Sequence, residues 1–222
     1  MSPSRTLRLA HRGDWRVAPE NTLAAFRAAL DRPACDGLEF DVRASADGVP
    51  VICHDASLER VQGQAGSVDT LAATDLGRFD VPTLAEVLET AGRRPFLDIE
   101  LKVEIGHVLI EVLAAGRGPE LHNAVVSSFE PAALEGVARR APAWPRWLNV
   151  AVLDRAAVAE AVRLGCRGVA AEWHSLDADS MALARASGLE VAAWTVRRRS
   201  TFARLADLGV AAVCVEATAL DG

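Results

Sequence analysis

The sequence lacks the long apolar segments that hold a protein in a membrane or direct its export. No apolar run approaches the roughly 20 residues that span a bilayer. Nor does the stretch from Met1 to Arg8 contain the apolar core of roughly 7–15 residues that a signal peptide needs. We therefore expect a cytoplasmic protein with no stable membrane insertion.

Paired cysteines and an excess of basic residues are absent as well. The four cysteines are scattered and form no CxxC motif, which argues against a zinc knuckle or a redox centre. With 24 basic and 30 acidic residues the formal net charge is −6, so we do not expect a nucleic-acid partner. A small anionic substrate held by a local pair of basic residues is compatible with this charge.

Short β-rich runs and amphipathic helical stretches alternate along the chain, as in an α/β protein. Half of the 222 residues are hydrophobic, enough for a sizeable core. The β-rich runs are Leu7–His11, Gly37–Val42, Phe96–Leu101, Ala124–Ser127, Trp147–Val152, Gly168–Ala171, Glu190–Val196 and Ala211–Val215. Eight strand–helix units of roughly 28 residues predict a (β/α)8 TIM barrel near the compact end of its size range. A doubly wound sheet is the alternative, because periodicity does not report closure.

One irregularity interrupts the alternation between predicted strands 2 and 3. A further short strand, Val49–His54, and a loop-rich stretch from Ala56 to Val81 replace the second helical unit. No low-complexity linker separates this stretch from the rest of the chain. We therefore expect residues 1–222 to form a single domain with a small insertion at about residues 55–81.

Charged residues alternate with apolar ones in two of the predicted strands, where a parallel barrel favours continuous apolar runs. Glu39 and Asp41 share one face of their strand, and Asp98, Glu100 and Lys102 share one face of the next. Because the apolar faces must meet the outer helices, we expect the charged faces to point into the barrel. Clustered carboxylates there suit a hard divalent cation such as Mg²⁺ or Ca²⁺. An internal salt-bridge network through Lys102 is the alternative.

Two histidines occupy equivalent places, His11 at the end of the first strand and His54 at the end of the extra strand. Histidine titrates near neutrality, so such a pair can supply one general acid and one general base. Arg12 and Lys102 add positive charge that matches phosphate oxygens. These groups together indicate chemistry on an anionic diester, which gains negative charge in its transition state.

These residues fall in motifs that resemble the signature series of the glycerophosphodiester phosphodiesterase family. The series runs in order as His11-Arg12-Gly13, Pro19-Glu20-Asn21-Thr22, Glu39-x-Asp41, His54-Asp55 and Glu100-x-Lys102. The resemblance implies an acid–base pair of His11 and His54, and a metal site of Glu39, Asp41 and Glu100. It also implies that Arg12 and Lys102 contact the phosphate, and that the products are an alcohol and sn-glycerol 3-phosphate. Attack by water and attack by the substrate's own glycerol hydroxyl both stay open.

Other positions bear on the substrate rather than on the chemistry. Trp194 is our candidate for an aromatic wall against the glycerol or a choline group. Arg197, after Trp-Thr-Val, and the last strand, which runs into Glu216, depart from the family pattern. A lysophospholipase D-like or cyclising enzyme acting on a lipid, and a non-catalytic binding protein on the same barrel, are the competing hypotheses. The sequence leaves open whether the chain forms homo-oligomers.

Overall fold

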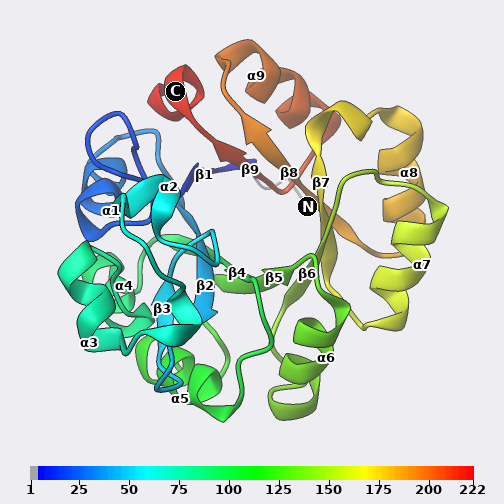
Figure 1. The fold of residues 1–222 in the computed structure, drawn as a ribbon. Helices are drawn as coiled ribbons and strands as arrows, with labels where there is room; N and C mark the ends of the chain where they lie inside the picture. Colours follow the sequence, from blue (N-terminus) through cyan, green and yellow to red (C-terminus); the bar gives the residue numbers. More distant parts are fainter. Residues whose placement is uncertain (1–4) are drawn as a thin grey trace.

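A closed ring of parallel strands forms the centre of the molecule, and helices surround it (Figure 1). The computed structural model describes residues 5–222. The first four residues, which belong to the predicted domain and to the stretch considered for a signal peptide, lie outside the described part. The ring strands are β1 (Leu7–His11), β2 (Gly37–Ala44), β4 (Phe96–Leu101), β5 (Ala124–Ser128), β6 (Arg146–Val150), β7 (Gly168–Glu172), β8 (Glu190–Val196) and β9 (Ala212–Val215). Pairing of β9 with β1, and of β1 with β2, closes the ring, which confirms the (β/α)8 barrel.

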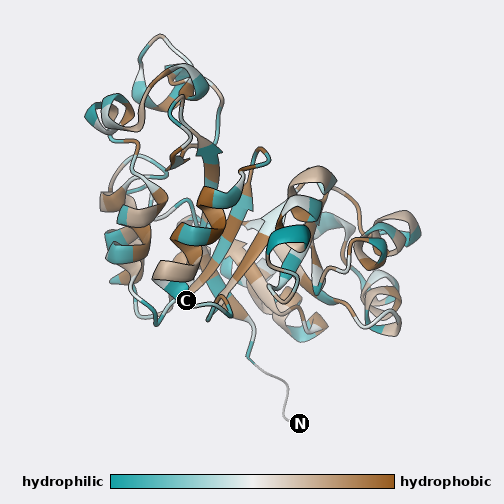
Figure 2. Cartoon of the chain, turned by 90° about the horizontal axis from the view of Figure 1, so that it is seen from below, coloured by the Kyte–Doolittle hydropathy of each residue, from teal (hydrophilic) through white to brown (hydrophobic). Residues whose placement is uncertain are grey.

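The helices follow the strands and cover the outside of the ring. They are α1 (Leu23–Leu30), α4 (Leu84–Ala91), α5 (His107–Arg117), α6 (Pro131–Arg140), α7 (Arg155–Arg163), α8 (Ala178–Ala186) and α9 (Arg199–Leu208). Within residues 5–222, no helix is both long and apolar enough to cross a membrane. Figure 2 shows apolar segments in the central strands and hydrophilic patches on the helices and loops around them.

The stretch between β2 and β4 contains the predicted excursion. It starts with β3 (Pro50–Ile52), which pairs antiparallel with the end of β2, and continues through the short helices α2 (Glu59–Gln62) and α3 (Ala73–Leu76). In the side view the excursion stands out from the barrel (Figure 2). Val51, Leu58 and Leu76 are fully buried in a small apolar cluster of its own. The excursion therefore has its own packing at the carboxyl ends of the barrel strands.

Several predicted strand boundaries differ from the structure by one or two residues, and two of these differences shorten a strand at its carboxyl end. The predicted strand Trp147–Val152 is β6, which ends at Val150 because its pairing with β7 stops at Ala171. Val152 lies beyond the sheet and is exposed. The predicted strand Val49–His54 is shortened to β3, so His54 lies in the turn that follows the strand rather than at its end.

The strand alternation places side chains as predicted. Leu38, Phe40 and Ile99 are fully buried in the layer between the ring and the helices. Inside the ring, the end at which the strands begin is filled by an apolar plug. Its members are Leu9, Val125, Trp147, Ala170, Ala192 and Ala212. Because the plug closes one end of the barrel, the charged side chains inside it meet solvent only at the other end.

Candidate active site

A cavity of about 210 Å³ opens at the carboxyl ends of the barrel strands. All the predicted site residues except Asp41 line it, and Asp41 lies buried directly beside its cations. The lining residues are His11, Arg12, Glu39, His54, Asp98, Glu100, Lys102, Phe129, Asn149, Ala170, Trp194, Thr195 and Cys214. Residues from seven strands, from the loops that follow strands and from the excursion thus converge on one space, as expected at this face of a TIM barrel.

Three carboxylates come together at the cavity wall. In the register of β2 and β4, Asp41 lies opposite Glu100 and Glu39 lies opposite Asp98. Glu39, Asp41 and Glu100 each have one carboxylate oxygen that lies within 4.8 Å of an oxygen of the other two. Side chains with this spacing and chemistry can share a hard cation.

The surroundings of these buried carboxylates stabilise the negative charge of some more than of others. Burial, reinforced by the neighbouring charges of Asp41 and Glu100, raises the pKa of Glu39 well above its usual value of 4.5. Burial also raises the pKa of Glu100, and it raises the pKa of Asp98 to about 7 although the Ser127 hydroxyl donates a hydrogen bond to it. Glu39 Oε1 is buried with no hydrogen-bond partner among residues 5–222. The cluster therefore has unmet capacity for positive charge.

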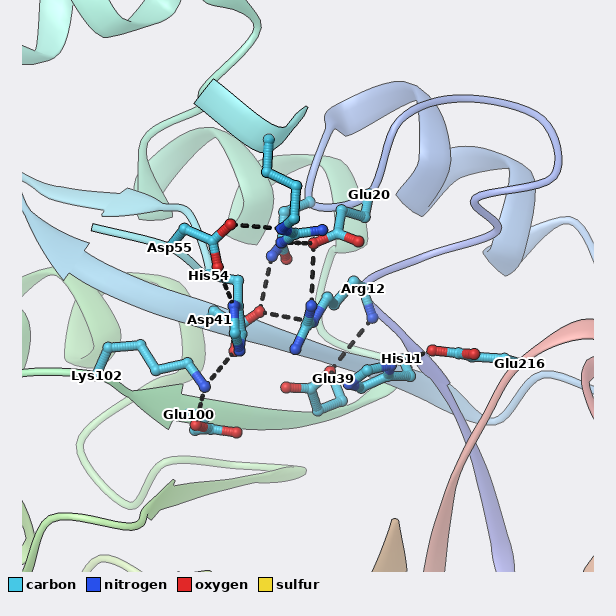
Figure 3. Close-up of polar contacts among 12 residues, drawn as sticks. His11, Arg12, Glu20, Glu39, Asp41, His54, Asp55, Glu100, Lys102 and Glu216 are labelled. Atoms are coloured by element: carbon cyan, nitrogen blue, oxygen red, sulfur yellow. Dashed lines mark hydrogen bonds and ion pairs between the residues drawn. The ribbon is translucent and has the colours of Figure 1, made fainter. Parts of the chain in front are cut away.

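Two cations compensate part of the cluster and meet at Asp41 (Figure 3). Arg12 Nε lies 3.0 Å from Asp41 Oδ2, and Lys102 Nζ lies 2.9 Å from Asp41 Oδ1 and is also paired with Glu100. Burial alone would raise the pKa of Asp41, but the charges of Arg12 and Lys102 outweigh it and lower the pKa to about 2. Asp41 is thus the ionised centre of the cluster. The predicted salt-bridge network and the predicted carboxylate cage share the same residues.

Both histidines line the cavity beside this cluster. His11 Nε2 lies 3.7 Å from Glu39 Oε2, a member of the carboxylate cluster. His54 Nδ1 lies 2.6 Å from Asp55 Oδ1, so Asp55 orients its imidazole. Burial lowers the pKa of His54 from its usual 6.5, against the opposing effect of Asp41. A partly buried neutral imidazole beside a carboxylate cluster is suited to accept a proton.

An aromatic wall forms one side of the cavity, where the sequence places Trp194. The rings of Trp194 and Phe129 meet edge to face with centroids 5.4 Å apart. Trp194 Nε1 donates a hydrogen bond to the Ala170 carbonyl at 3.0 Å, which fixes the indole. Phe129 lies 43% exposed at the mouth. This wall gives the cavity an apolar side, and Lys102 Nζ lies 6.0 Å from the centre of the Phe129 ring.

Three contributors were missed or undervalued by sequence reasoning. Glu216 Oε1 contacts His11 Nδ1 at 2.6 Å, and Arg60 from the excursion binds both Asp55 and Glu20. Asn21 donates a hydrogen bond to Asp41 at 2.8 Å. The position of Glu216 directly after the last strand could have indicated its contact with His11, because barrel closure brings that strand beside β1.

The chain is similar to known phosphodiesterases over almost its whole length. Residues 11–220 match the family model described as "Glycerophosphoryl diester phosphodiesterase family". A curated glycerophosphodiester phosphodiesterase from Caldanaerobacter subterraneus is 29% identical, over 93% of this chain and 92% of its own. A phosphodiesterase from Oleispira antarctica, solved with the product sn-glycerol-3-phosphate, is 28% identical with a TM-score of 0.85, over 95% of this chain and 93% of its own. A structure from Galdieria sulphuraria shows the same fold, with a TM-score of 0.84 at 21% identity. The match covers 97% of this chain and 95% of the other.

The raised pKa of Glu39 makes a prediction about stability. This pKa is higher in the folded chain than in the unfolded one. The contribution of Glu39 to the free energy of unfolding is therefore complete below pH 4.5 and is lost as the pH rises through the raised pKa. Glu39→Gln, which cannot ionise, should therefore increase the free energy of unfolding at pH 8 in EDTA by about 1 kcal/mol or more. The gain should disappear near pH 4.5.

Denaturant unfolding at several pH values measures this difference, and Glu89→Gln on the exposed face of α4 is the control. Equal stability of Glu39→Gln and wild type at every pH would contradict the strained carboxylate cluster.

Proposed function

Because this chain belongs to the glycerophosphoryl diester phosphodiesterase family, a family of phosphoric diester hydrolases, we propose that it hydrolyses glycerophosphodiesters to an alcohol and sn-glycerol 3-phosphate. The observation that carries the proposal is the convergence of His11, His54, two cations and a carboxylate cluster on one cavity. The similarity to a phosphodiesterase solved with sn-glycerol-3-phosphate supports the substrate class. In this proposal residues 1–222 act as one catalytic domain, with residues 55–81 as its insertion.

The carboxylate cluster fits a divalent cation, Mg²⁺ or Ca²⁺, as cofactor. Its donors are all hard oxygens, and the partnerless Glu39 Oε1 and the raised carboxyl pKa values both point to missing positive charge. Glu39, Asp41 and Glu100 would hold the ion. A bound cation supplies Lewis-acid stabilisation of the charge that develops on a phosphoryl group.

Arg12 and Lys102 bind the phosphate in this proposal. Both line the cavity and both are tied to Asp41, which keeps their charged ends at its wall. The guanidinium offers a fork that fits two phosphate oxygens, while the ammonium acts as a point charge. Their charges also stabilise the additional negative charge of the transition state.

His11 and His54 exchange protons with the attacking and leaving oxygens. His54, with its lowered pKa, starts neutral as the base, which leaves the role of the acid to His11. Direct attack by water and attack by the glycerol hydroxyl both use this pair, so both routes remain part of the proposal.

The substrate we favour is a small, water-soluble diester. The Trp194–Phe129 wall offers a surface for the glycerol carbons or for a choline head group. A lipid substrate finds less support in the excursion, because its apolar residues are buried in their own cluster. None of the exposed large hydrophobic residues described in 5–222 lies in residues 55–81. The excursion therefore gives a lipid chain no apolar platform.

Release of glycerol 3-phosphate from glycerophosphocholine and glycerophosphoethanolamine tests the proposal. We expect release with Mg²⁺ or Ca²⁺ and none in EDTA. His11→Ala should reduce the rate by about 10²–10⁴-fold, the contribution of an acid–base group. His174→Ala, an exposed histidine outside the cavity, is the matched control and should stay near the wild-type rate. Unchanged release from His11→Ala would refute the proposed site.

The histidine pair also predicts a bell-shaped dependence of kcat on pH. Protonation of the base lowers the rate at acid pH, and deprotonation of the acid lowers it at alkaline pH. Because burial lowers the pKa of His54 below 6.5, the acid limb should lie below pH 6.5. Rates measured from pH 5 to 9 with chemistry rate-limiting check this prediction, and a flat profile would contradict it.

A further inference from the structure

Glu216 lies at the junction that closes the barrel, next to His11. In the parallel register of β1 and β9, Val215 pairs with Ala10, so the residues that follow, Glu216 and His11, are at the same level. The Glu216 amide donates a hydrogen bond to the Val196 carbonyl at 2.8 Å, which fixes its backbone against β8. The side chain is 9% exposed. Its place beside the histidine is therefore set by the closed sheet.

Both carboxylate oxygens of Glu216 have a partner. Oε1 lies 2.6 Å from His11 Nδ1, and Oε2 accepts a hydrogen bond from Arg197 Nε at 2.8 Å. Burial would raise the pKa of Glu216, but these two partners lower it to about 2. An ionised carboxylate only accepts hydrogen bonds, so the proton of this contact belongs to Nδ1 of the imidazole.

We propose that Glu216, held by Arg197, is a positioning residue that fixes the Nδ1–H form of neutral His11 and directs its Nε2 into the cavity. The inference rests on the proposed function, in which His11 exchanges protons with the substrate. Nε2 is the atom that lies on the Glu39 side of the ring, so it is the one within reach of a bound phosphodiester. The carboxylate–histidine arrangement is a known means of fixing an imidazole for proton transfer.

The other histidine of the site has a matching arrangement. His54 Nδ1 contacts Asp55 (Figure 3). Asp55 is held in turn by Arg60 from α2 in the excursion. A structural ion pair that only closes the barrel would not require the same histidine–carboxylate–arginine order at a second, unrelated place. The repetition indicates that both imidazoles are oriented through Nδ1 and both present Nε2.

Kinetics of Glu216→Gln test the proposal. The amide can donate a hydrogen bond to Nδ1 and so permits the other tautomer of His11. We expect kcat for glycerophosphocholine to fall about 100-fold or more, with KM within twofold of wild type. Glu216→Asp should recover part of the loss. Arg197→Gln, at a largely exposed side chain, keeps the carboxylate and should lower kcat by a smaller factor.

Glu172→Gln is the matched control, since Glu172 makes the same contact with Nδ1 of His174 outside the cavity. It should change kcat less than twofold. Wild-type kcat in Glu216→Gln would overturn the proposal.

Nitrogen-15 NMR of the histidine rings in metal-free protein decides the tautomer without turnover. We expect neutral His11 to carry its proton on Nδ1 in wild type and, in substantial part, on Nε2 in Glu216→Gln. If Glu216→Gln does not fold, Arg197→Gln with its partial shift serves in its place. An unchanged tautomer in the folded variant, or an Nε2–H form in wild type, would overturn the proposal. If the wild-type protein cleaves no glycerophosphodiester, the proposed function fails, while the ring signals still report the role of Glu216.

Discussion

Carboxylates facing the inside of a closed barrel are the constraint on which the rest of this structure depends. Glu39, Asp41, Asp98 and Glu100 are all buried, and the apolar plug keeps water from reaching them from below. Each would be costly to ionise alone. Arg12 and Lys102 offset part of this cost at Asp41, and the remaining carboxyl groups have raised pKa values. The site is thus prepared for a further cation at the expense of stability.

The outer parts of the site are arranged around that cluster. The β1–α1 loop supplies Arg12, which hydrogen-bonds through its backbone to the Glu39 carbonyl at 2.9 Å. The excursion supplies His54 and Arg60, and the last two strand ends supply Arg197 and Glu216. The barrel fixes the carboxylates, while the segments at its open end hold the groups that we propose to move protons. In this proposal, substrate binding and proton transfer depend on segments that are far apart in the sequence.

Sequence reasoning reached the barrel and the centre of the site because both follow from local patterns. The period-two alternation around Glu39 and Glu100 indicated which faces point inward, and the register of β2 and β4 agrees with it. The pairing of His11 with Glu216 was missed, because it depends on closure between residues separated by 205 positions and not on a local pattern. The end of β6 at Val150 was missed because it is set by the pairing with β7, not by local propensity. Long-range pairings are where a single sequence carries least information.

Calorimetric titration of Mg²⁺ and Ca²⁺ into EDTA-stripped protein is the most direct measurement of the central claim. The carboxylate cluster should bind one ion per chain and release protons, because ligands with raised pKa values must lose them on binding. Titrations in buffers of different ionisation enthalpy measure that release. The same titration of Glu100→Ala should show no comparable site. Binding to Glu100→Ala as tight as to wild type, or no binding to either protein, would contradict the account.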